Sequence, residues 1–427
     1  MKVTVIGMGK IGLPLAVNFA RHQAMVTGLD IQDNVVSLIN QGIEPFPGEK
    51  DLEFFLRKCL NENVFFASTD KEQSISNADV LVVCIPLIVD EKGEPDFTNI
   101  DQLSMDIGVN LSPGTLICFE TTLPVGTTRN RFTLAIERFS GLKVGIDFFV
   151  VFSPERVLTG RVFEDLRRYP KLVGGVTEQC TKAGEKFYGS VLSFDERPDL
   201  QKPNGVWALK NCEAAEFAKI AETTYRDVNI GLANEFSIFA SKHGLEVQEV
   251  IEAANSQPYS RIHTPGISVG GHCIPVYPRF YMWKNPNSGI VSAAREQNLS
   301  MPKRAVEQIK LSLGTLTNLR VGVLGITYRE GVKEHSFSGA IDLLRLLNIE
   351  GANVYGLDPF YEQSEIQKLG FLDVAELDKL DVIVLHTDHQ EFTEIDYGSL
   401  QELQVFYDGR NSYSHLAKTA NFKYLSI

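Results

Sequence analysis

Residues 1–30, "MKVTVIGMGKIGLPLAVNFARHQAMVTGLD", decide the fold. An apolar run typical of a short buried strand comes first, and the motif GxGxxG follows it at Gly7, Gly9 and Gly12. Apolar residues then recur at helical spacing, and a second apolar run ends in Asp30. This order of strand, glycine turn, helix, strand and acid predicts the start of a Rossmann-type domain that binds a dinucleotide.

The residue types in this turn suit a dinucleotide for physical reasons. The glycines permit a tight turn, close approach of a pyrophosphate and close packing of helix on strand. The N-terminus of the helix offers free N–H groups to the phosphates. Asp30 can accept hydrogen bonds from both ribose hydroxyls, and since no arginine immediately follows it, the pattern favours NAD over NADP. The predicted cofactor-binding residues of this segment are Gly7, Gly9, Lys10, Ile11, Gly12 and Asp30.

Three further apolar runs, "VLVVCIP", "TLICFETT" and "DFFVVFSPE", predict more strands of the same sheet. Each is almost continuously apolar, as a parallel sheet covered on both faces requires. In open α/β sheets the ligand lies at the carboxyl ends of the strands. The residues expected to converge there, near the cofactor, are Pro86, Thr121, Thr122, Pro154 and Glu155. This NAD-binding domain is predicted to cover residues 1–200.

The rest of the chain predicts a helical region and a second α/β domain. After the linker "DERPDLQKPNG", helical spacing of apolar residues predicts one long helix from Val206 to His243 and a second helix near 246–254. The runs "LRVGVLGIT", "NVYGLDP" and "DVIVLHTD", with a helix near 338–348, predict a second doubly wound domain. Its first turn, "GITYREG", lacks the GxGxxG spacing, which favours a different ligand from a second dinucleotide.

The predicted fold class is therefore α/β, with two Rossmann-like doubly wound domains joined by a long central helix and a small all-α region. The central region is assigned to residues 201–302 and the second α/β domain to residues 315–427. A chain of 427 residues is also expected to form more than one hydrophobic core.

The composition of the chain limits the kinds of molecule that it is expected to bind. The net charge of −13 argues against nucleic acid and anionic membranes as partners. No apolar run approaches the length of a membrane span, and Met1 leads into a strand rather than a signal peptide. The six cysteines are scattered without CxxC spacing, so neither a metal site nor a disulfide framework is expected. Reduced thiols fit a cytoplasmic protein.

The stretch "SVGGHCIPVYP", residues 268–278, contains a cysteine that follows two glycines. Glycines let a backbone approach a ligand closely. A thiolate at Cys273 could attack an aldehyde, and the resulting thiohemiacetal could lose a hydride to NAD and leave a thioester that water hydrolyses. The alternative is that Cys273 is a small buried apolar side chain.

Two charged residues have both a catalytic and a structural interpretation. Lys219, in an apolar helix, could stabilise an oxyanion or lower a thiol pKa, or it could pair with Glu216 or Glu222. Glu155 could be a general base for a water held by Thr122, or it could form an ion pair with Arg156.

The chain resembles the UDP-glucose/GDP-mannose dehydrogenase family over essentially its whole length. The motifs that carry the resemblance include "VIGMGKIGLPLA", "ETTLPVGTTR", "SPERVLTGR", "KLVGG", "EFAKIAETTYRDVNIGLANE", "GGHCIP", "VLGITYREGVKE" and "DVIVLHTDHQEF". The resemblance implies two NAD-dependent oxidations at C6 of a nucleotide sugar, alcohol to aldehyde to carboxylate, as in polysaccharide biosynthesis.

The resemblance also implies roles for individual residues. Cys273 would be the covalent nucleophile, Lys219 the oxyanion-stabilising lysine, Glu155 the acid/base and Thr122 the residue that orients water. Family members are usually dimers built on the central helix, so a homodimer is expected, with Arg261 a candidate to cross the interface. The implied substrate-binding residues are Arg156, Val157, Leu158, Arg161, Lys219, Thr223, Arg261, Gly270, Gly271 and, near the nucleotide phosphates, Arg329.

The motifs "SPERV", "GGHCIP" and "TDHQEF" are more similar to the branch that acts on UDP-N-acetylhexosamines than to the UDP-glucose branch. The predicted substrate is therefore UDP-N-acetylglucosamine or UDP-N-acetylmannosamine, with UDP-glucose as the alternative.

Three positions depart from the family pattern. Tyr277 stands where the family commonly has Asp, Thr223 where it has Asn, and Ser336 where it has an arginine near the cofactor. A tyrosine of pKa about 10 can donate a hydrogen bond but is a poor base at pH 7. Glu155 could then carry the proton transfer alone, or His272 could assist. The departures leave two further hypotheses open, a two-electron oxidoreductase and a non-catalytic protein that binds NAD and a nucleotide sugar.

Overall fold

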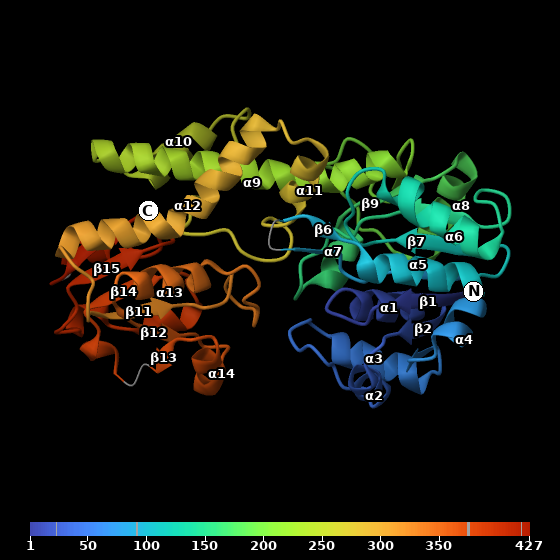
Figure 1. Cartoon of the computed structure of the whole chain (residues 1–427), viewed down its shortest axis with the longest axis horizontal. Coiled ribbons are helices and arrows are strands. Elements are labelled where there is room, and N and C mark those ends of the chain that lie inside the picture. Colours follow the sequence, from blue (N-terminus) through green and yellow to red (C-terminus); the bar gives the residue numbers. More distant parts are fainter. Residues whose placement is uncertain (23, 91–92, 374–375, 420) are drawn as a thin grey trace. The chain divides into compact units, whose positions relative to one another are not determined.

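The computed structural model describes residues 1–22, 24–90, 93–373, 376–419 and 421–427. The chain divides into two compact units, residues 1–221 and 222–427 (Figure 1). The boundary falls within one long helix, α9 (Cys212–His243), so the two units are joined by continuous helical backbone.

The first unit is built on a sheet of eight strands in the order β10-β9-β8-β7-β4-β1-β2-β3. Neighbouring strands are parallel except that β9 runs antiparallel to β8. The strands predicted at the glycine turn and in the next three apolar runs are confirmed. The bounds are β1 Lys2–Ile6, β2 Met25–Leu29, β3 Phe65–Ser68, β4 Val80–Val83, β7 Leu116–Phe119, β8 Phe149–Phe152, β9 Lys171–Gly175 and β10 Val206–Ala208.

Helices of the first unit pack along this sheet and on one another. α8 packs on β8 and β9, α1 contacts β1 and β2, and α5 packs against α6. The short strands β5 (Ile88–Val89) and β6 (Pro95–Asp96) form a separate antiparallel pair. The helical bounds are α1 Gly12–Arg21, α2 Asp33–Asn40, α3 Leu52–Asn61, α4 Lys71–Ser76, α5 Thr98–Asn110, η1 Thr128–Thr133, α6 Leu134–Ser140, α7 Val162–Arg168 and α8 Glu178–Val191.

The predicted start of the long helix is wrong. Val206–Ala208 forms the edge strand β10, which pairs with β9 in the register Val206↔Lys171. The helix α9 begins at Cys212, directly after Asn211, whose side-chain oxygen accepts the N–H of Ala214 at 2.9 Å. Pairing with a neighbouring strand, which local spacing does not reveal, therefore overrides the helical pattern at residues 206–208.

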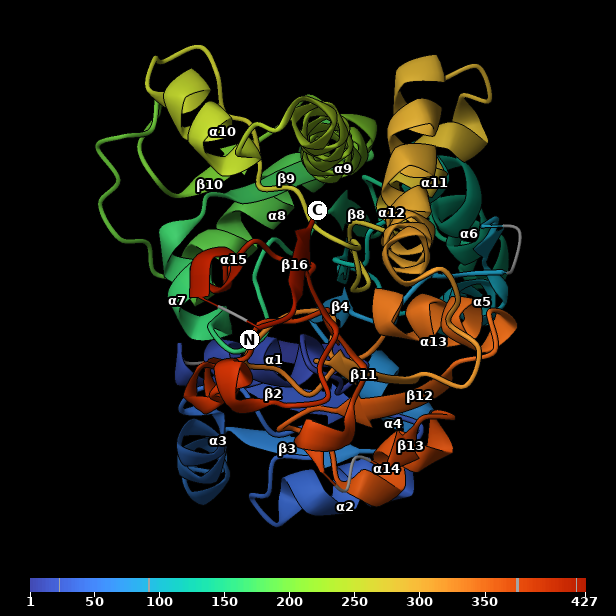
Figure 2. The same cartoon turned by 90° about the vertical axis from the view of Figure 1, so that its left-hand side faces the viewer.

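The second unit holds an all-parallel sheet in the order β13-β12-β11-β14-β15-β16. The helix α13 packs on β11 and β12, and α14 lies beside β12 and β13 (Figure 2). The strand bounds are β11 Arg320–Leu324, β12 Asn353–Leu357, β13 Leu372–Asp373, β14 Val382–Leu385, β15 Val405–Asp408 and β16 Lys423–Ser426.

Helices of the second unit include the two that the sequence predicts, α10 (Val247–Asn255) and α13 (Gly339–Ile349), each within one residue of its expected bounds. The remaining bounds are α11 Tyr277–Lys284, α12 Gly289–Leu313, α14 Gln363–Lys368, α15 Leu416–Thr419, η2 Leu377–Lys379, η3 Gln390–Glu394 and η4 Tyr397–Ser399. Within the described part of the chain, no helix is both long enough and apolar enough to cross a bilayer.

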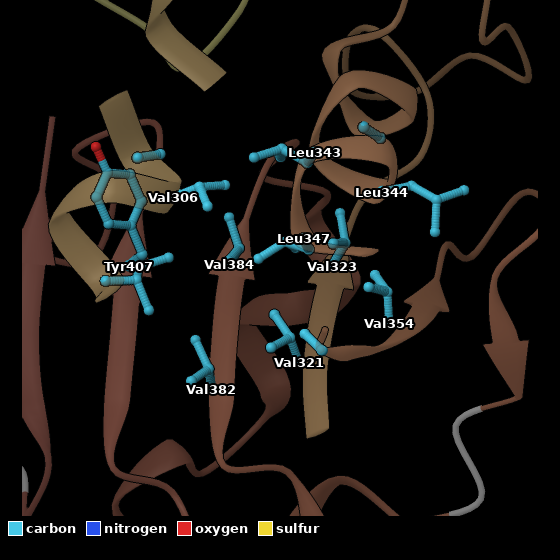
Figure 3. Packing of buried hydrophobic residues seen from close by; sticks show 14 of the residues in the cluster. Val306, Val321, Val323, Leu343, Leu344, Leu347, Val354, Val382, Val384 and Tyr407 are labelled. Carbon is cyan, nitrogen blue, oxygen red and sulfur yellow. The ribbon is translucent and has the colours of Figure 1, made fainter. Parts of the chain in front are cut away.

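One of the hydrophobic clusters of the second unit lies between this sheet and the helices α12 and α13. In Figure 3, Leu343 and Leu347 project from α13 toward Val323 and Val384 on the central strands. These four side chains are fully buried. Parallel strands rich in β-branched residues and covered by an amphipathic helix produce this arrangement. The packed strands hold the start of the loops that follow β11 and β14.

Candidate active site

The glycine turn of the first unit has the geometry that its sequence predicts. Gly7 has φ +96°, in the left-handed region that favours glycine. A Cβ on Gly12 would lie 1.8 Å from the Gly7 carbonyl oxygen, so only glycine allows α1 to start this close to the turn. Gly9 is exposed, and a Cβ there would meet no atom of the described chain within 4 Å. The turn therefore leaves open space above its backbone.

Asp30 is held beside this turn. Its Oδ2 accepts the backbone N–H of Met8 at 2.8 Å, and its Oδ1 accepts the N–H of Gln32 at 3.0 Å. A carboxylate has about four acceptor positions, so the two bonds orient Asp30 and leave capacity for ribose hydroxyls. At the next strand ends, the Thr121 hydroxyl donates to the carbonyl of Ile85, adjacent to Pro86. These groups fit a dinucleotide.

A cluster of buried charges lies at the carboxyl ends of β7 and β8. Lys171 Nζ lies 2.9 Å from Glu155 Oε2 and 2.5 Å from Glu120 Oε2, and the Tyr188 hydroxyl donates to Glu120 Oε1 at 2.6 Å. The Lys171 and Glu120 side chains are 4% and 1% exposed. The ion-pair partner of Glu155 identified here is thus Lys171, which the sequence did not suggest, and the N–H of Arg156 also donates to Glu155.

Burial and charge shift the pKa values of Glu155 and Glu120 in opposite directions. Burial raises the pKa of Glu155, but the charge of Lys171 and its hydrogen bond outweigh this, and the net pKa is lowered. The charge of Lys219 also lowers it, so Lys219 lies within electrostatic reach of Glu155. Burial raises the pKa of Glu120 to about 7 in spite of Lys171. Glu155 is therefore the ionised carboxylate of the pair near neutral pH.

The loop that carries Thr122 is fixed by Glu216. The Glu216 side chain accepts the N–H of Gly126 at 2.6 Å, the N–H of Thr128 at 2.8 Å and the Thr128 hydroxyl at 2.6 Å. Glu216 lies on α9 one turn before Lys219, and burial raises its pKa to about 7. The sequence suggested Glu216 as an ion-pair partner for Lys219, whereas these bonds join it to the Thr122 loop. Thr122 and Lys219 are both buried, at 5% exposure each.

The segment after Glu155 is held by acidic side chains. Asp165 accepts the N–H of Leu158 at 3.0 Å and the guanidinium of Arg161 at 2.7 Å. Glu49 accepts the N–H groups of Gly160 and Val162 at 2.6 and 2.7 Å. The segment that includes the predicted substrate residues Arg156, Val157, Leu158 and Arg161 is thus anchored, and the Arg161 charge is shared with Asp165.

Cys273 lies in the second unit and is exposed. The other five cysteines, all in the first unit, are buried or half-buried. A Cβ on Gly270 would lie 2.6 Å from Tyr328, and one on Gly271 would lie 2.8 Å from the same side chain. Glycine at both positions therefore lets the Cys273 loop lie against the segment after β11.

Tyr277 begins α11, and its N–H donates to the carbonyl of Cys273 at 2.9 Å. A backbone bond thus joins residue 277 to the cysteine. Arg329 follows β11 and donates through Nε to the Tyr328 hydroxyl at 3.3 Å. Arg261 lies in an exposed loop, with its carbonyl accepting the Asn229 amide at 2.7 Å, and Thr223 is fully buried on α9.

Family models match three successive parts of the chain. These are the NAD binding domain, residues 1–192, the central domain, residues 213–300, and the UDP binding domain, residues 322–415, each of the UDP-glucose/GDP-mannose dehydrogenase family. The chain belongs to this family. The predicted family and fold class are confirmed, and the cofactor of the first domain is NAD.

Individual relatives cover nearly the whole chain. The UDP-N-acetyl-D-mannosamine dehydrogenase of Pyrococcus horikoshii is 32% identical over 424 residues, which are 96% of each chain. The NDP-N-acetyl-D-galactosaminuronic acid dehydrogenase of Ralstonia solanacearum is 30% identical, again over 96% of each. The solved structure of the Pyrococcus horikoshii UDP-D-ManNAc dehydrogenase matches with a TM-score of 0.90 and 31% identity, over 100% of this chain and 99% of that one.

Sequence reasoning missed Lys171 and Glu120 as members of the charged cluster. A signal for Lys171 was present, since it is the one charged residue in the apolar strand "KLVGG". A lysine in such a strand requires a buried counter-charge.

Gly9→Ala tests the fit of NAD to the turn. Because the added methyl group meets nothing in the protein, we expect the fold to be retained and the affinity for NAD to fall by about tenfold or more. Isothermal titration calorimetry measures the affinity. Gly189→Ala is the matched control, because a Cβ at this exposed helical position also meets nothing within 4 Å. Unchanged NAD affinity in Gly9→Ala would contradict the assignment.

Lys171→Met tests the charged cluster. Two buried carboxylates would then lack their cation, so the first unit should lose about 3–5 kcal/mol of stability at pH 8. Without Lys171 the pKa values of both carboxyl groups rise above their unfolded values, so protonation relieves the repulsion and the loss should be smaller at pH 5. Thermal unfolding at the two pH values measures the difference.

Two controls accompany this variant. Lys171→Arg keeps the cation, and Lys182→Met removes an exposed lysine paired with Glu178, so both should unfold close to the wild-type temperature. A loss in Lys171→Met that is the same at pH 5 and pH 8 would show that packing, and not charge, sets the effect.

Proposed function

We propose that the protein is an NAD-dependent nucleotide-sugar 6-dehydrogenase that oxidises the C6 hydroxyl of a UDP-N-acetylhexosamine to a carboxylate. The observation that carries the proposal is the environment of Cys273, an exposed thiol on a glycine loop in a chain of this family. In this proposal residues 1–200 bind NAD, residues 201–302 carry Lys219 and Cys273, and residues 315–427 bind the UDP moiety.

NAD, when bound, accepts a hydride from C6 in each of the two oxidations. Glu155 is ionised near neutral pH and is suited to take the proton of the C6 hydroxyl as the alcohol becomes an aldehyde. The Cys273 thiolate then forms a bond to the aldehyde carbon, and Lys219 stabilises the negative oxygen that results. Loss of the second hydride leaves a thioester on Cys273.

Water held by Thr122 completes the reaction. Glu155, which has by then released its first proton to solvent, takes a proton from this water as the water oxygen adds to the thioester carbon. The C–S bond breaks, Cys273 leaves as its thiolate, and the acid loses a proton to solvent as the carboxylate product departs. The Glu216 bonds to residues 126 and 128 support this role, because they fix the loop that positions Thr122. A tyrosine side chain is a poor base at pH 7, so the proposal assigns the proton transfer to Glu155.

The proposed substrate class rests on the relatives. Those reported above are named for N-acetylated sugars, a UDP-mannosamine and a galactosaminuronic acid. The UDP-binding domain supports a uridine diphosphate, with Arg329 proposed to face the phosphates. UDP-glucose is the alternative substrate.

The stoichiometry of NADH tests the proposed reaction. With a panel of UDP-N-acetylmannosamine, UDP-N-acetylglucosamine, UDP-N-acetylgalactosamine and UDP-glucose, we expect two NADH per sugar with an N-acetylated substrate, and a uronic acid product. Cys273→Ser should lower acid formation by at least about a thousandfold. NAD affinity of the same preparation, measured by calorimetry, is the control for folding.

Two other results would favour the rival hypotheses. One NADH per sugar with release of aldehyde by the wild type would indicate a two-electron oxidoreductase. NAD and UDP-sugar binding with no NADH formed from any member of the panel would indicate a binding protein without activity.

We also propose that the protein forms a homodimer through α9. Four large apolar residues on this helix, Tyr225, Leu232, Phe236 and Phe239, are 55%, 44%, 38% and 59% exposed. Their spacing of seven, four and three residues puts them on one face of the helix. A contiguous exposed apolar face is typical of a protein–protein interface.

Leu232→Asp tests the proposed interface. A charge in an apolar interface should shift the protein from dimer to monomer, as measured by light scattering after size-exclusion chromatography. Leu311→Asp is the matched control, because Leu311 is an exposed leucine near the end of another helix, α12. A monomeric wild type, or a Leu232→Asp variant that remains dimeric, would exclude this interface.

A further inference from the structure

The loop that carries Cys273 makes a side-chain hydrogen bond to a buried histidine. Ser268 Oγ lies 2.8 Å from Nε2 of His386. Ser268 belongs to the "SVGGHC" stretch that ends in Cys273, and His386 follows β14 in the α/β domain of the same unit. His386 is 0% exposed.

The surroundings of His386 fix its protonation. Nδ1 lies 2.8 Å from the carbonyl oxygen of Gly325, and a carbonyl can only accept, so Nδ1 carries the proton. Burial, followed by the charge of Arg410, lowers the pKa of His386 to about 3. The neutral ring therefore accepts at Nε2, and the Ser268 hydroxyl donates to it. His386 thus bridges Ser268 to the first residue after β11.

Two other contacts join the Cys273 loop to the same segment after β11. The N–H of Gly271 donates to the carbonyl of Ser336 at 2.9 Å. Gly270 and Gly271 lie so close to Tyr328 that neither could carry a Cβ without displacing it. Segment 325–336, which includes Arg329, therefore contacts the Cys273 loop directly at Tyr328 and Ser336 and is linked to it through His386 at Gly325.

We propose that the Ser268–His386 hydrogen bond couples nucleotide binding at segment 325–336 to the position of Cys273. This rests on the proposed function, in which Arg329 faces the phosphates and Cys273 is the nucleophile. A ligand that orders segment 325–336 also orders the loop bonded to it, and by linkage the loop position affects the affinity for the nucleotide. Ser268 and His386 are then positioning residues for the thiol.

The rate of Cys273 alkylation measures this coupling. Iodoacetamide labels the exposed thiol, and peptide mass spectrometry gives the rate constant for Cys273 separately from the other five cysteines. UDP is the probe ligand. In the wild type we expect saturating UDP to slow alkylation by about fivefold, which corresponds to about one net hydrogen bond.

Two variants remove the bond from opposite sides. Ser268→Ala removes the donor, and His386→Asn keeps a donor for the Gly325 carbonyl while removing the acceptor for Ser268. In each variant, and in the double variant, the effect of UDP on the alkylation rate should fall below about twofold. The double variant should behave like either single variant, because both remove the same interaction.

Tyr407→Phe is the matched control. It removes another part-buried side-chain hydrogen bond of the same unit, from the Tyr407 hydroxyl to Gln308 at 2.9 Å, and should keep the full effect of UDP. If Ser268 and His386 had only a structural role, their variants would lose thermal stability, as Tyr407→Phe would, but would keep the UDP effect. Loss of the UDP effect in the Ser268 and His386 variants, but not in Tyr407→Phe, therefore indicates coupling.

Two results would overturn the coupling. Equal slowing by UDP in wild type and Ser268→Ala would mean that UDP only shields the thiol, and no effect of UDP on the wild type would mean that the sites are independent. Alkylation does not depend on acid formation. If Cys273→Ser still made uronic acid while the UDP effect behaved as expected, the proposed function would fail and the coupling would stand.

Discussion

The charged groups at the carboxyl ends of β7 and β8 depend on one buried ammonium group, that of Lys171. Lys171 lies between Glu120 and Glu155, and without it two carboxylates would face each other away from water. Taking charges out of water is costly unless they are paired. Lys171 keeps the pKa of Glu155 low while that of Glu120 rises to about 7, so the two acids differ in protonation near neutral pH. An ionised, oriented Glu155 is what the proposed proton transfer requires.

The reversed direction of β9, which β10 shares, brings Lys171 to this position. The strand β9 runs antiparallel to β8, with Phe152 opposite Gly174. Continuing that register puts Lys171, the first residue of β9, level with Glu155, beyond the end of β8. In an all-parallel sheet the first residue of a strand would lie at the opposite edge from the ligand crevice. The departure from parallel topology thus supplies the cation that the site needs.

The sequence predicts the parts of the fold that local pattern determines. The turn from Gly7 to Gly12 and the position of Asp30 are specified within thirty residues, and the structure places them as predicted. The sequence does not predict the direction of β9. That direction depends on pairing with β8, and the apolar run "KLVGG" fits a parallel or an antiparallel strand equally well. For this reason sequence reasoning missed Lys171 as the partner of Glu155. It also missed the strand Val206–Ala208, because pairing with β9 overrides the helical spacing of its apolar residues.

The same reasoning applies to Glu216 and the long helix. Helical spacing predicts which residues of α9 share a face with Lys219, but it cannot indicate which backbone groups approach that face. Glu216 accepts three bonds from residues 126 and 128, which lie far away in sequence. A buried carboxylate that binds backbone N–H groups orders a loop and contributes a charge only when it is ionised. Its role could be recognised only from the tertiary structure.

The loop that carries Cys273 is held on both sides of the cysteine by contacts within the second unit. Asn234 accepts the N–H of Gly266 at 2.9 Å before the cysteine, and Arg295 donates to the carbonyl of Ile274 at 3.3 Å after it. Arg295 is itself paired with the fully buried Asp227 at 3.0 Å. These contacts, with the backbone bond from residue 277 to Cys273, fix the loop without a carboxylate at 277. The bonds described here therefore hold the loop through groups other than the side chain of residue 277.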